Sequence, residues 1–186
     1  ADPPFIAVAQ GGGPCSHLAS TNAPSAAFLG RASDEKFAKT TGRSYAETAR
    51  RQGIGVILAP ILDIEKPGLS PAIWKNRLFS HDTTVVVNMG LSFAQGILDQ
   101  GALPVVKYYP GMGSAVFNAK GRRVIEETDL SALVEGLLPF DQAVTKNIPG
   151  ILVGHVAVPG LDPQFPFRSA ALSPKLVQTI LRDHWG

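Results

Sequence analysis

The residues best suited to chemistry follow four apolar stretches, each of which predicts a β-strand. They are, in chain order, Gln10, Asp63, Lys107 with Tyr108, and His155. Lys107 is the most informative, because burying an ammonium group without a carboxylate or a wet cavity is costly. Asp63 could supply that carboxylate, either in a structural ion pair or in a ligand site. His155 on its own is better explained as a hydrogen-bonded histidine of the core than as a catalytic residue.

The stretch from Leu103 to Gly113, LPVVKYYPGMG, indicates how such a site is built. Val105 and Val106 favour a buried strand, because β-branched residues suit the pleated backbone. Pro110 and the glycines around it then predict a sharp turn. The carboxyl ends of parallel strands meet at one edge of a sheet, so the polar residues that follow the strands should converge there. A cation beside two tyrosine rings is typical of a pocket floor rather than of a core.

The rest of the chain alternates apolar strands with amphipathic helices, which predicts parallel strands covered by helices. Strands are expected at residues 5–8 and 54–58, from residue 103 onward, and at residues 151–153. Helices are expected at residues 34–51, 82–98, 128–143 and 174–184, with Ser33 and Ser173 at their starts and residues 21–31 irregular. The buried side of helix 128–143 is expected to carry Leu130, Leu133, Val134, Leu137 and Leu138. Periodicity alone leaves open whether these α/β units form a small open sheet or half of an eight-unit barrel.

Composition limits the classes of partner. Of the 186 residues, 45% are hydrophobic and 17% charged, which fits one folded domain spanning residues 1–186. The net charge of +2 gives no reason to expect nucleic acid as a partner, and no apolar run is long enough for a membrane span. Cys15 is the single cysteine, which excludes an internal disulfide framework. No signal peptide is visible and both ends are expected to be cut from something longer, so localisation stays open.

The cofactor and nucleophile motifs are weak. Residues 11–14, GGGP, lack the Lys-Ser/Thr ending of a phosphate-binding loop. Cys15 and His17 do not show zinc-site spacing, and Ser16 does not lie in a GxSxG nucleophile motif. We therefore expect no cofactor and no metal.

Five segments together resemble a known family: FIAVAQGGG, LAPILDI, LPVVKYYPGMG, ILVGHVAVPGLDP and LSPKLVQTILR. They are similar to the N-terminal barrel domain of glycoside hydrolase family 3, especially its β-N-acetylhexosaminidase branch, whose members read VDQEGGR, APVLDV, KHFPGHG and AHV at the strand exits. The order and spacing match over nearly the whole chain. The resemblance implies a partial TIM-type (β/α) barrel of about four βα units. It also implies hydrolysis of O-glycosyl bonds as the family activity and an amino-sugar glycoside as the carbohydrate partner.

The resemblance also assigns site residues. The substrate-binding positions carried over are Lys107, Arg77, Asp63, Tyr108 and His155. Asn118 and Lys120 fall at the family's Asp-x-His general acid/base, a role that neither residue type suits at neutral pH. Further family positions have changed: Ala9 replaces Asp, Gly11 replaces Glu, Pro14 and His17 replace Arg, and Tyr108 and Met112 replace His. A retaining glycosidase needs two carboxyl groups flanking the bond, and no convincing pair is retained.

Three interpretations follow from these substitutions. The first is a glycosidase-derived domain that is catalytically impaired or inactive, a pseudoenzyme, with residual carbohydrate binding. The second is a structural or assembly module that self-associates, or docks onto a partner chain, through the open edges of a half-barrel. The third is a fragment of an active glycosidase, because the family's nucleophile strand would follow Gly186.

Overall fold

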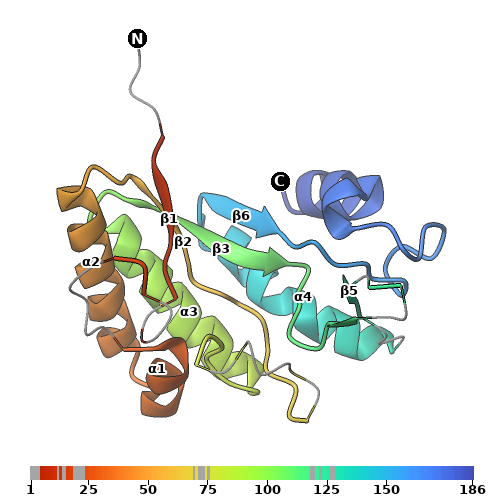
Figure 1. Cartoon of the computed structure of the whole chain (residues 1–186), viewed down its shortest axis with the longest axis horizontal. Coiled ribbons are helices and arrows are strands. Elements are labelled where there is room, and N and C mark those ends of the chain that lie inside the picture. The colour runs from red at the N-terminus through yellow and green to blue at the C-terminus, as the bar shows by residue number, and fades with distance from the viewer. Residues whose placement is uncertain are drawn as a thin grey trace.

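The computed structural model describes residues 5–11, 13, 16–18, 24–68, 70, 74, 76–117, 120–121, 123–125 and 129–186. Within them, four parallel strands form one sheet in the order β1-β2-β3-β6 (Figure 1). The strands are β1 (Ala7–Ala9), β2 (Val56–Leu58), β3 (Leu103–Tyr109) and β6 (Gly150–Val153). Each lies where an apolar run predicts it, so the α/β class with four parallel strands is confirmed.

The register of the sheet brings the carboxyl ends of the strands together. Val56 of β2 lies beside Ala7 of β1 and Leu103 of β3. Gly150 of β6 lies beside Val105 of β3. Because the spatial order of the strands equals their order in the chain, the sheet has the arrangement of one side of a (β/α) barrel. The polar residues that follow β2, β3 and β6 therefore share one edge.

Helices cover this sheet and connect its strands. They are α1 (Ala26–Ala32), α2 (Glu35–Arg51), α3 (Thr83–Leu98), α4 (Leu130–Thr145), the 3₁₀ turn η3 (Ala170–Leu172) and the C-terminal helix η4 (Lys175–His184), whose hydrogen bonding is π-helical. Helix α3 packs between α2 and α4, and α3 and α4 both lie along β3 (Figure 1). A short antiparallel pair, β4 (Val116–Phe117) and β5 (Arg123–Val124), follows β3. None of the helices in the described part of the chain is long and apolar enough to cross a membrane.

Polar caps fix where the helices begin. The side chains of Asp34, Asp82 and Asp129 accept hydrogen bonds from backbone N–H groups in the first turns of α2, α3 and α4. Ser173 does the same for η4 at 3.2 Å, as its position before Pro174 predicts. Ser33, which was expected to begin a helix, instead ends α1 in a left-handed conformation with φ of 47°. The predicted helices are confirmed, with Asp34 in place of Ser33 as the cap.

Helix α1 corrects the expectation that residues 21–31 are irregular. Residues 21–23 lie outside the described residues, but Ala26–Ala32 is helical and Ser25 caps it by accepting from the Phe28 N–H at 3.3 Å. Gly30 is needed where α1 meets the chain before α3, since a Cβ there would lie 1.8 Å from the Phe79 carbonyl oxygen. The alanines that suggested a loop are good helix formers once a cap is present.

The buried face of α4 also differs from the prediction. Leu130, Val134 and Leu138 are 64%, 55% and 43% exposed. Leu133 is buried as predicted and Leu137 packs partly buried against the core, while the other buried positions are Pro139, Phe140 and Ala143. The contact with the rest of the fold runs along this second arc because Gly136 lies there. A Cβ added to Gly136 would lie 3.8 Å from the Pro110 carbonyl oxygen. Apolar residues surround most of α4, so composition alone does not identify the arc that faces the sheet.

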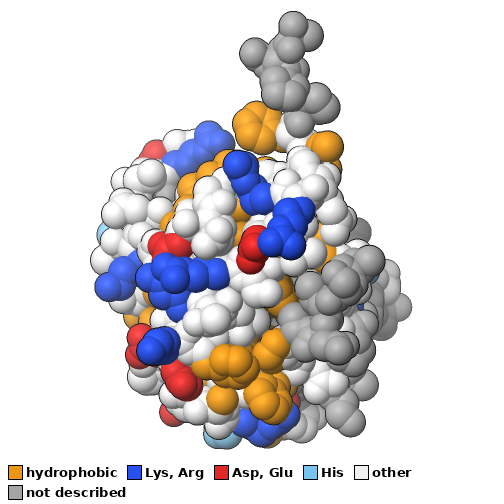
Figure 2. Space-filling model, turned by 90° about the vertical axis from the view of Figure 1, so that its left-hand side faces the viewer, with side chains coloured by type: hydrophobic (Ala, Val, Ile, Leu, Met, Phe, Trp, Pro, Cys, Tyr) orange, Lys and Arg blue, Asp and Glu red, His pale blue; other side chains and the backbone are white. Residues whose placement is uncertain are grey.

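Helices α1 and α2 lie on the side of the molecule that Figure 2 shows. Figure 2 shows lysine and arginine side chains on this face interspersed with acidic ones and flanked by an apolar patch. Asp99, after α3, pairs with Lys39 at 3.1 Å and with Arg43 at 2.6 Å. These cations tie α2 to α3 at the surface, where such pairs contribute little to stability.

Candidate functional site

Lys107 is a buried cation in the last part of β3. It is 5% exposed, and its backbone N–H donates to the Pro60 carbonyl at 3.1 Å. Its own carbonyl accepts from the Leu62 N–H at 2.6 Å, so β3 is joined to the chain that follows β2. Burial lowers the pKa of Lys107 to about 8, with a further lowering by the Arg77 charge and an opposing effect of Asp63. The ammonium form therefore predominates at neutral pH, although burial destabilises it relative to the neutral amine.

A bulge at the end of β3 places Tyr108 next to this cation. Lys107 pairs with Leu152 of β6 and Tyr109 pairs with Val153, so Tyr108 is the extra residue. The Lys107 Nζ lies 5.3 Å from the centroid of the Tyr108 ring, within cation–π range. Tyr109 is fully buried and donates its hydroxyl hydrogen to the Leu176 carbonyl at 3.0 Å. The first tyrosine thus belongs to the site, whereas the second anchors η4.

Tyr108 is held by a second aromatic ring and stays a neutral phenol. Its ring lies 5.8 Å from that of Trp74, at an angle of 53°. Burial raises the pKa of Tyr108, and the Arg77 and Arg123 charges lower it while Asp63 raises it. A neutral hydroxyl can both donate and accept a hydrogen bond. The half-buried ring also offers an apolar face to a ligand.

Asp63, after β2, forms a hydrogen bond with the turn that follows β3. It is 1% exposed, and its Oδ1 accepts a hydrogen bond from the Met112 N–H at 2.6 Å, while its buried Oδ2 has no hydrogen-bond partner among the described residues. Burial raises the pKa of Asp63 to about 7, and backbone N–H groups and the Lys107 charge lower it only in part. Although both residues are described, no ion pair joins Asp63 to Lys107. Their predicted pairing is a through-space interaction, not a direct salt bridge.

Arg77 joins this cluster from the segment before α3. It is half-buried, and its backbone N–H donates a hydrogen bond to the Trp74 carbonyl at 2.8 Å. Its charge acts on both Lys107 and Tyr108. It also lines a small cavity of about 20 Å³ together with Gln10. The structure therefore brings together Lys107, Tyr108, Asp63 and Arg77.

The remaining predicted positions differ in their surroundings. Gly154, next to His155, packs against Tyr108, since an added Cβ would lie 3.3 Å from the Tyr108 Cβ, and Gln10 lines the small cavity with Arg77. His155 is exposed after β6, and no described residue forms a hydrogen bond or ion pair with it, so its interpretation as a core histidine is wrong. Gln10 is 1% exposed; its Nε2 donates to the Ser16 Oγ at 2.8 Å and its Oε1 accepts from the His17 N–H at 2.8 Å, which is a structural role in the loop after β1. Lys120 is exposed, and Asn118 lies outside the described residues.

The turn at Pro110–Gly113 is fitted tightly between its neighbours. A Cβ on Gly113 would lie 1.9 Å from the Ile64 carbonyl oxygen, and the Ser70 hydroxyl donates to the Gly113 carbonyl at 2.5 Å. Gly111 adopts φ of 117°, which favours glycine. The backbone of this turn therefore requires glycine at both positions.

Replacing Gly113 with alanine should lower the free energy of unfolding by roughly 2 kcal/mol or more, because backbone atoms would have to move. Gly55→Ala is the matched control, since a Cβ at Gly55 meets nothing within 4 Å. Urea denaturation of both variants measures the difference. Equal midpoints for Gly113→Ala and Gly55→Ala would contradict the close fit of the turn.

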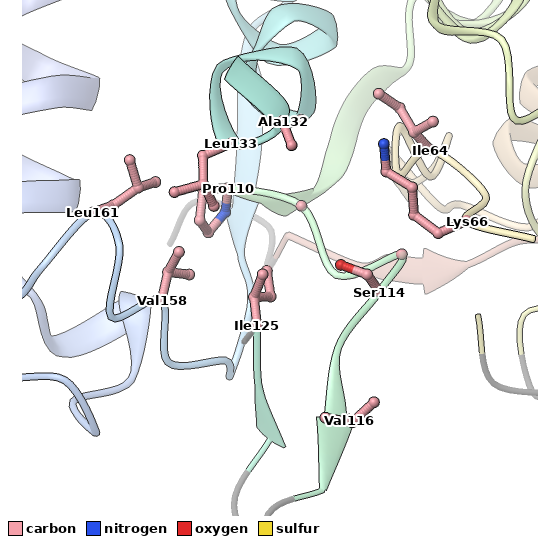
Figure 3. A pocket seen from close by; sticks show the side chains of 13 residues that line it. Ile64, Lys66, Pro110, Ser114, Val116, Ile125, Ala132, Leu133, Val158 and Leu161 are labelled. Carbon is pink, nitrogen blue, oxygen red and sulfur yellow. The ribbon is translucent and has the colours of Figure 1, made fainter. Parts of the chain in front are cut away.

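A cavity that the sequence did not predict lies on the other side of this turn. It has a volume of about 260 Å³ and lies among the turn after β3, the first turns of α4 and the loops after β2 and β6 (Figure 3). Its polar side chains are Lys66, whose Nζ binds Glu135 of α4 at 3.0 Å, and Ser114. Its apolar lining is Ile64, Pro110, Val116, Ile125, Ala132, Leu133, Val158 and Leu161. Three glycines, Gly111, Gly113 and Gly136, also line it. Among the described residues, no group of three or more His, Cys, Asp or Glu side chains could hold a metal.

A parallel sheet with polar groups at its carboxyl edge defines an α/β domain of the barrel class. The model of the glycosyl hydrolase family 3 N-terminal domain matches residues 2–186 of this chain. The chain belongs to that family, and its domain is β-hexosaminidase-like.

Individual relatives agree with this assignment. The chain is 28% identical over 180 residues to the β-hexosaminidase LpqI of Mycobacterium tuberculosis, covering 95% of this chain and 46% of the relative. It is 31% identical over 167 residues to a β-hexosaminidase of Methylococcus capsulatus, covering 86% and 47%. The chain thus spans about half the length of the curated relatives it matches.

Solved structures show the same fold. A glycoside hydrolase family 3 β-N-acetylglucosaminidase from Paenibacillus sp. FPU-7 superposes with a TM-score of 0.87 at 25% identity, covering 100% of this chain and 35% of that one. LpqI of M. tuberculosis superposes with a TM-score of 0.82 at 29% identity, covering 96% and 52%. The partial TIM-type barrel inferred from the sequence motifs is confirmed.

Proposed function

We propose that residues 1–186 form one partial-barrel domain whose site at Lys107 binds an amino-sugar glycoside. The observation that carries this proposal is the buried Lys107 ammonium, 5% exposed and 5.3 Å from the centre of the Tyr108 ring. A ligand that brings oxygen atoms to this ammonium would satisfy a cation that forms no salt bridge with any carboxylate of the described residues. The amino-sugar class follows from the relatives, which are named β-hexosaminidases.

The cluster has the parts that sugar recognition needs. The half-buried Tyr108 ring can pack against the apolar face of a pyranose, while its hydroxyl and the Lys107 ammonium bind ring substituents. Arg77 adds a guanidinium with fixed donor geometry. The centres of the Trp74 and Tyr108 rings lie 5.8 Å apart, so the tyrosine ring is held in place before the ligand arrives. This preorganisation lowers the entropic cost of binding.

We further propose that this domain is impaired in hydrolysis by the family's two-carboxylate route. That route needs an acid and a nucleophile on opposite sides of the scissile bond. Among the described residues, Asp63 is the one carboxyl group that acts on Lys107 and Tyr108, and its Oδ1 is already bonded to the Met112 N–H. The resemblance places Asn118 and Lys120 at the general acid/base positions, which also supports weak or absent turnover.

Calorimetric titration with N-acetylglucosamine and chitobiose tests the binding, and an aryl N-acetyl-β-glucosaminide assay tests the turnover. We expect heat of binding at millimolar or lower sugar concentration and no hydrolysis above the buffer rate. Absence of binding at tens of millimolar would remove the carbohydrate proposal. Hydrolysis that follows enzyme concentration would overturn the impairment and favour an active glycosidase.

A second candidate function is assembly with another chain. In the described sheet, β1 and β6 each have one neighbour, so each presents an unpaired edge. Phe5 and Ile6 before β1 are 87% and 48% exposed, which adds apolar surface at one edge. Sedimentation at several protein concentrations tests this, since an assembly module should gain mass as concentration rises. A monomer at every concentration would exclude self-association.

A further inference from the structure

The cavity of about 260 Å³ beside the Pro110–Gly113 turn is not used by the candidate sugar site. None of Lys107, Tyr108 and Arg77 lines it. Its walls come from the loop after β2, the turn after β3, the β4–β5 pair, the first half of α4 and the loop after β6 (Figure 3). The cavity is therefore a separate place at which a small molecule could bind.

The lining of the cavity is aliphatic on one side and polar on the other. Figure 3 shows Leu133, Val158 and Leu161 on one side and Lys66 and Ser114 on the opposite side. Leu133, Val158 and Leu161 are all buried. Among the described lining residues there is no aromatic ring, so a ligand gains neither ring stacking nor a cation–π contact. The walls thus offer aliphatic contact at one end and a hydrogen bond at the other.

The polar side of the cavity offers a hydrogen bond but no unpaired charge. The Lys66 ammonium already binds the Glu135 carboxylate at 3.0 Å, and Glu135 also accepts from the Thr83 hydroxyl at 2.8 Å. The half-buried Ser114 side chain forms no hydrogen bond with the other described residues, so its hydroxyl can pair with a ligand. Burying a charged ligand group without a partner is costly. The preferred ligand should therefore be uncharged and should carry a hydroxyl group.

Contacts between the walls fix the shape of the cavity. The Lys66–Glu135 pair joins the loop after β2 to α4. The Ser70 hydroxyl donates to the Gly113 carbonyl at 2.5 Å, which joins the same loop to the turn after β3. On the opposite wall, a backbone N–H just after β5 donates to a carbonyl of the loop after β6 at 2.9 Å. A pocket formed in advance lowers the entropic cost of binding.

We propose that this cavity is a second ligand site, which takes an uncharged aliphatic chain of about six to eight carbons ending in a hydroxyl group. A dry cavity of about 150 Å³ takes benzene, so about 260 Å³ has room for a longer chain. The chain packs against Leu133, Val158 and Leu161, and its hydroxyl bonds to Ser114. Apolar contact supplies most of the affinity, because each buried methylene group favours binding about fourfold. This inference goes beyond the proposed function and does not depend on sugar binding at Lys107.

A series of straight-chain alcohols tests the proposal by ¹H–¹³C NMR of the methyl groups of the intact chain. Affinity should rise about fourfold per added carbon from 1-butanol to 1-hexanol and level off near 1-octanol. Saturable shifts should appear at the methyl groups of Leu133, Val158 and Leu161. Hexanoate and hexylammonium at pH 7 are the charged arms, and each should bind at least about tenfold more weakly than 1-hexanol.

Changing the size of the cavity should change the binding. Ala132→Leu places a larger side chain in the cavity from the first turn of α4 and should weaken 1-hexanol binding about tenfold or more. Ala27→Leu, at a half-buried alanine of α1 outside the cavity, is the matched control and should leave the affinity unchanged. Leu161→Ala enlarges the cavity, so the highest affinity should move to longer alcohols. Circular dichroism reports whether each variant is folded, and Leu161→Ala decides the question if Ala132→Leu does not fold.

The contrary results are equally specific. Absence of saturable methyl shifts with 1-hexanol at tens of millimolar would show that the cavity is not a ligand site. Tighter binding of hexanoate than of 1-hexanol would show that Lys66 exchanges Glu135 for the ligand, which overturns an uncharged ligand. Shifts centred outside the lining residues, or unchanged 1-hexanol affinity in folded Ala132→Leu, would place the alcohol elsewhere and overturn the assignment. Sugar binding at Lys107 is measured with a different ligand, so its failure leaves this inference standing.

Discussion

Replacing Lys107 with methionine is expected to lower the affinity for N-acetylglucosamine about tenfold or more while leaving the chain folded. The substitution keeps an unbranched side chain of similar length in a site that is 5% exposed, but it removes the ammonium donor. A hydrogen bond from a charged group contributes about 1.5–3 kcal/mol, and a tenfold change corresponds to about 1.4 kcal/mol. Calorimetric titration of the wild type and the variant measures the difference.

The stability of the same variant separates a ligand-binding role from a structural one. A buried ammonium without a direct ion pair costs free energy in the folded state, so Lys107→Met should unfold at the same or a higher denaturant concentration. Lys146→Met, at the exposed end of α4, is the matched control and should change neither affinity nor stability. A Lys107→Met variant that binds sugar normally but unfolds more easily would show that Lys107 is structural.

Replacing Asp63 with asparagine is expected to change how stability depends on pH. The pKa of Asp63 is about 7 in the folded chain and 3.8 without the fold, so the folded state binds the proton more tightly. The stabilisation from this proton is complete below about pH 4 and is lost as the pH rises through about 7. The difference of about three pKa units corresponds to about 4 kcal/mol as an order of magnitude.

Urea denaturation at several pH values between 4 and 8 measures this effect. The wild type should lose stability relative to Asp63→Asn as the pH rises across that range, because only the wild type must ionise a buried carboxyl group. The asparagine carbonyl still accepts the hydrogen bond from the Met112 N–H, so the turn should be kept. Asp129→Asn, an exposed helix cap, is a control that should not reproduce this slope. Parallel pH profiles for the wild type and Asp63→Asn would contradict the raised pKa.

Local sequence was sufficient for most elements of the fold. Strands followed from apolar runs bounded by Gly and Pro, and the predicted helix starts at residues 82 and 128 lie at or next to the observed caps Asp82 and Asp129. The prediction was wrong at α1, where a capped run of alanines and serines resembles a loop. It was wrong in part for the buried face of α4, where Leu133 is buried as predicted but Leu130, Val134 and Leu138 are exposed, because long-range packing decides which apolar side of the helix faces the core.

The candidate site could be predicted only in part. Lys107 and Tyr108 were found because a cation and a phenol interrupt an apolar strand, and Arg77 came from family resemblance alone. The role of Asp63 could not be predicted, since its partner is a backbone N–H 49 residues away in the chain. His155 showed the limit of reasoning from strand ends: it follows β6 as expected, but its side chain is exposed.

A ¹H–¹⁵N NMR titration of the intact chain with N-acetylglucosamine tests the central claim most directly, because it locates the ligand as well as detecting it. The account predicts saturable shifts of the backbone amides of Lys107, Tyr108 and Met112, and of Arg77 before α3. It predicts no such shifts at the exposed face of α2. Saturation of the titration with no shift at Lys107 or Tyr108, or shifts centred on another part of the chain, would contradict it.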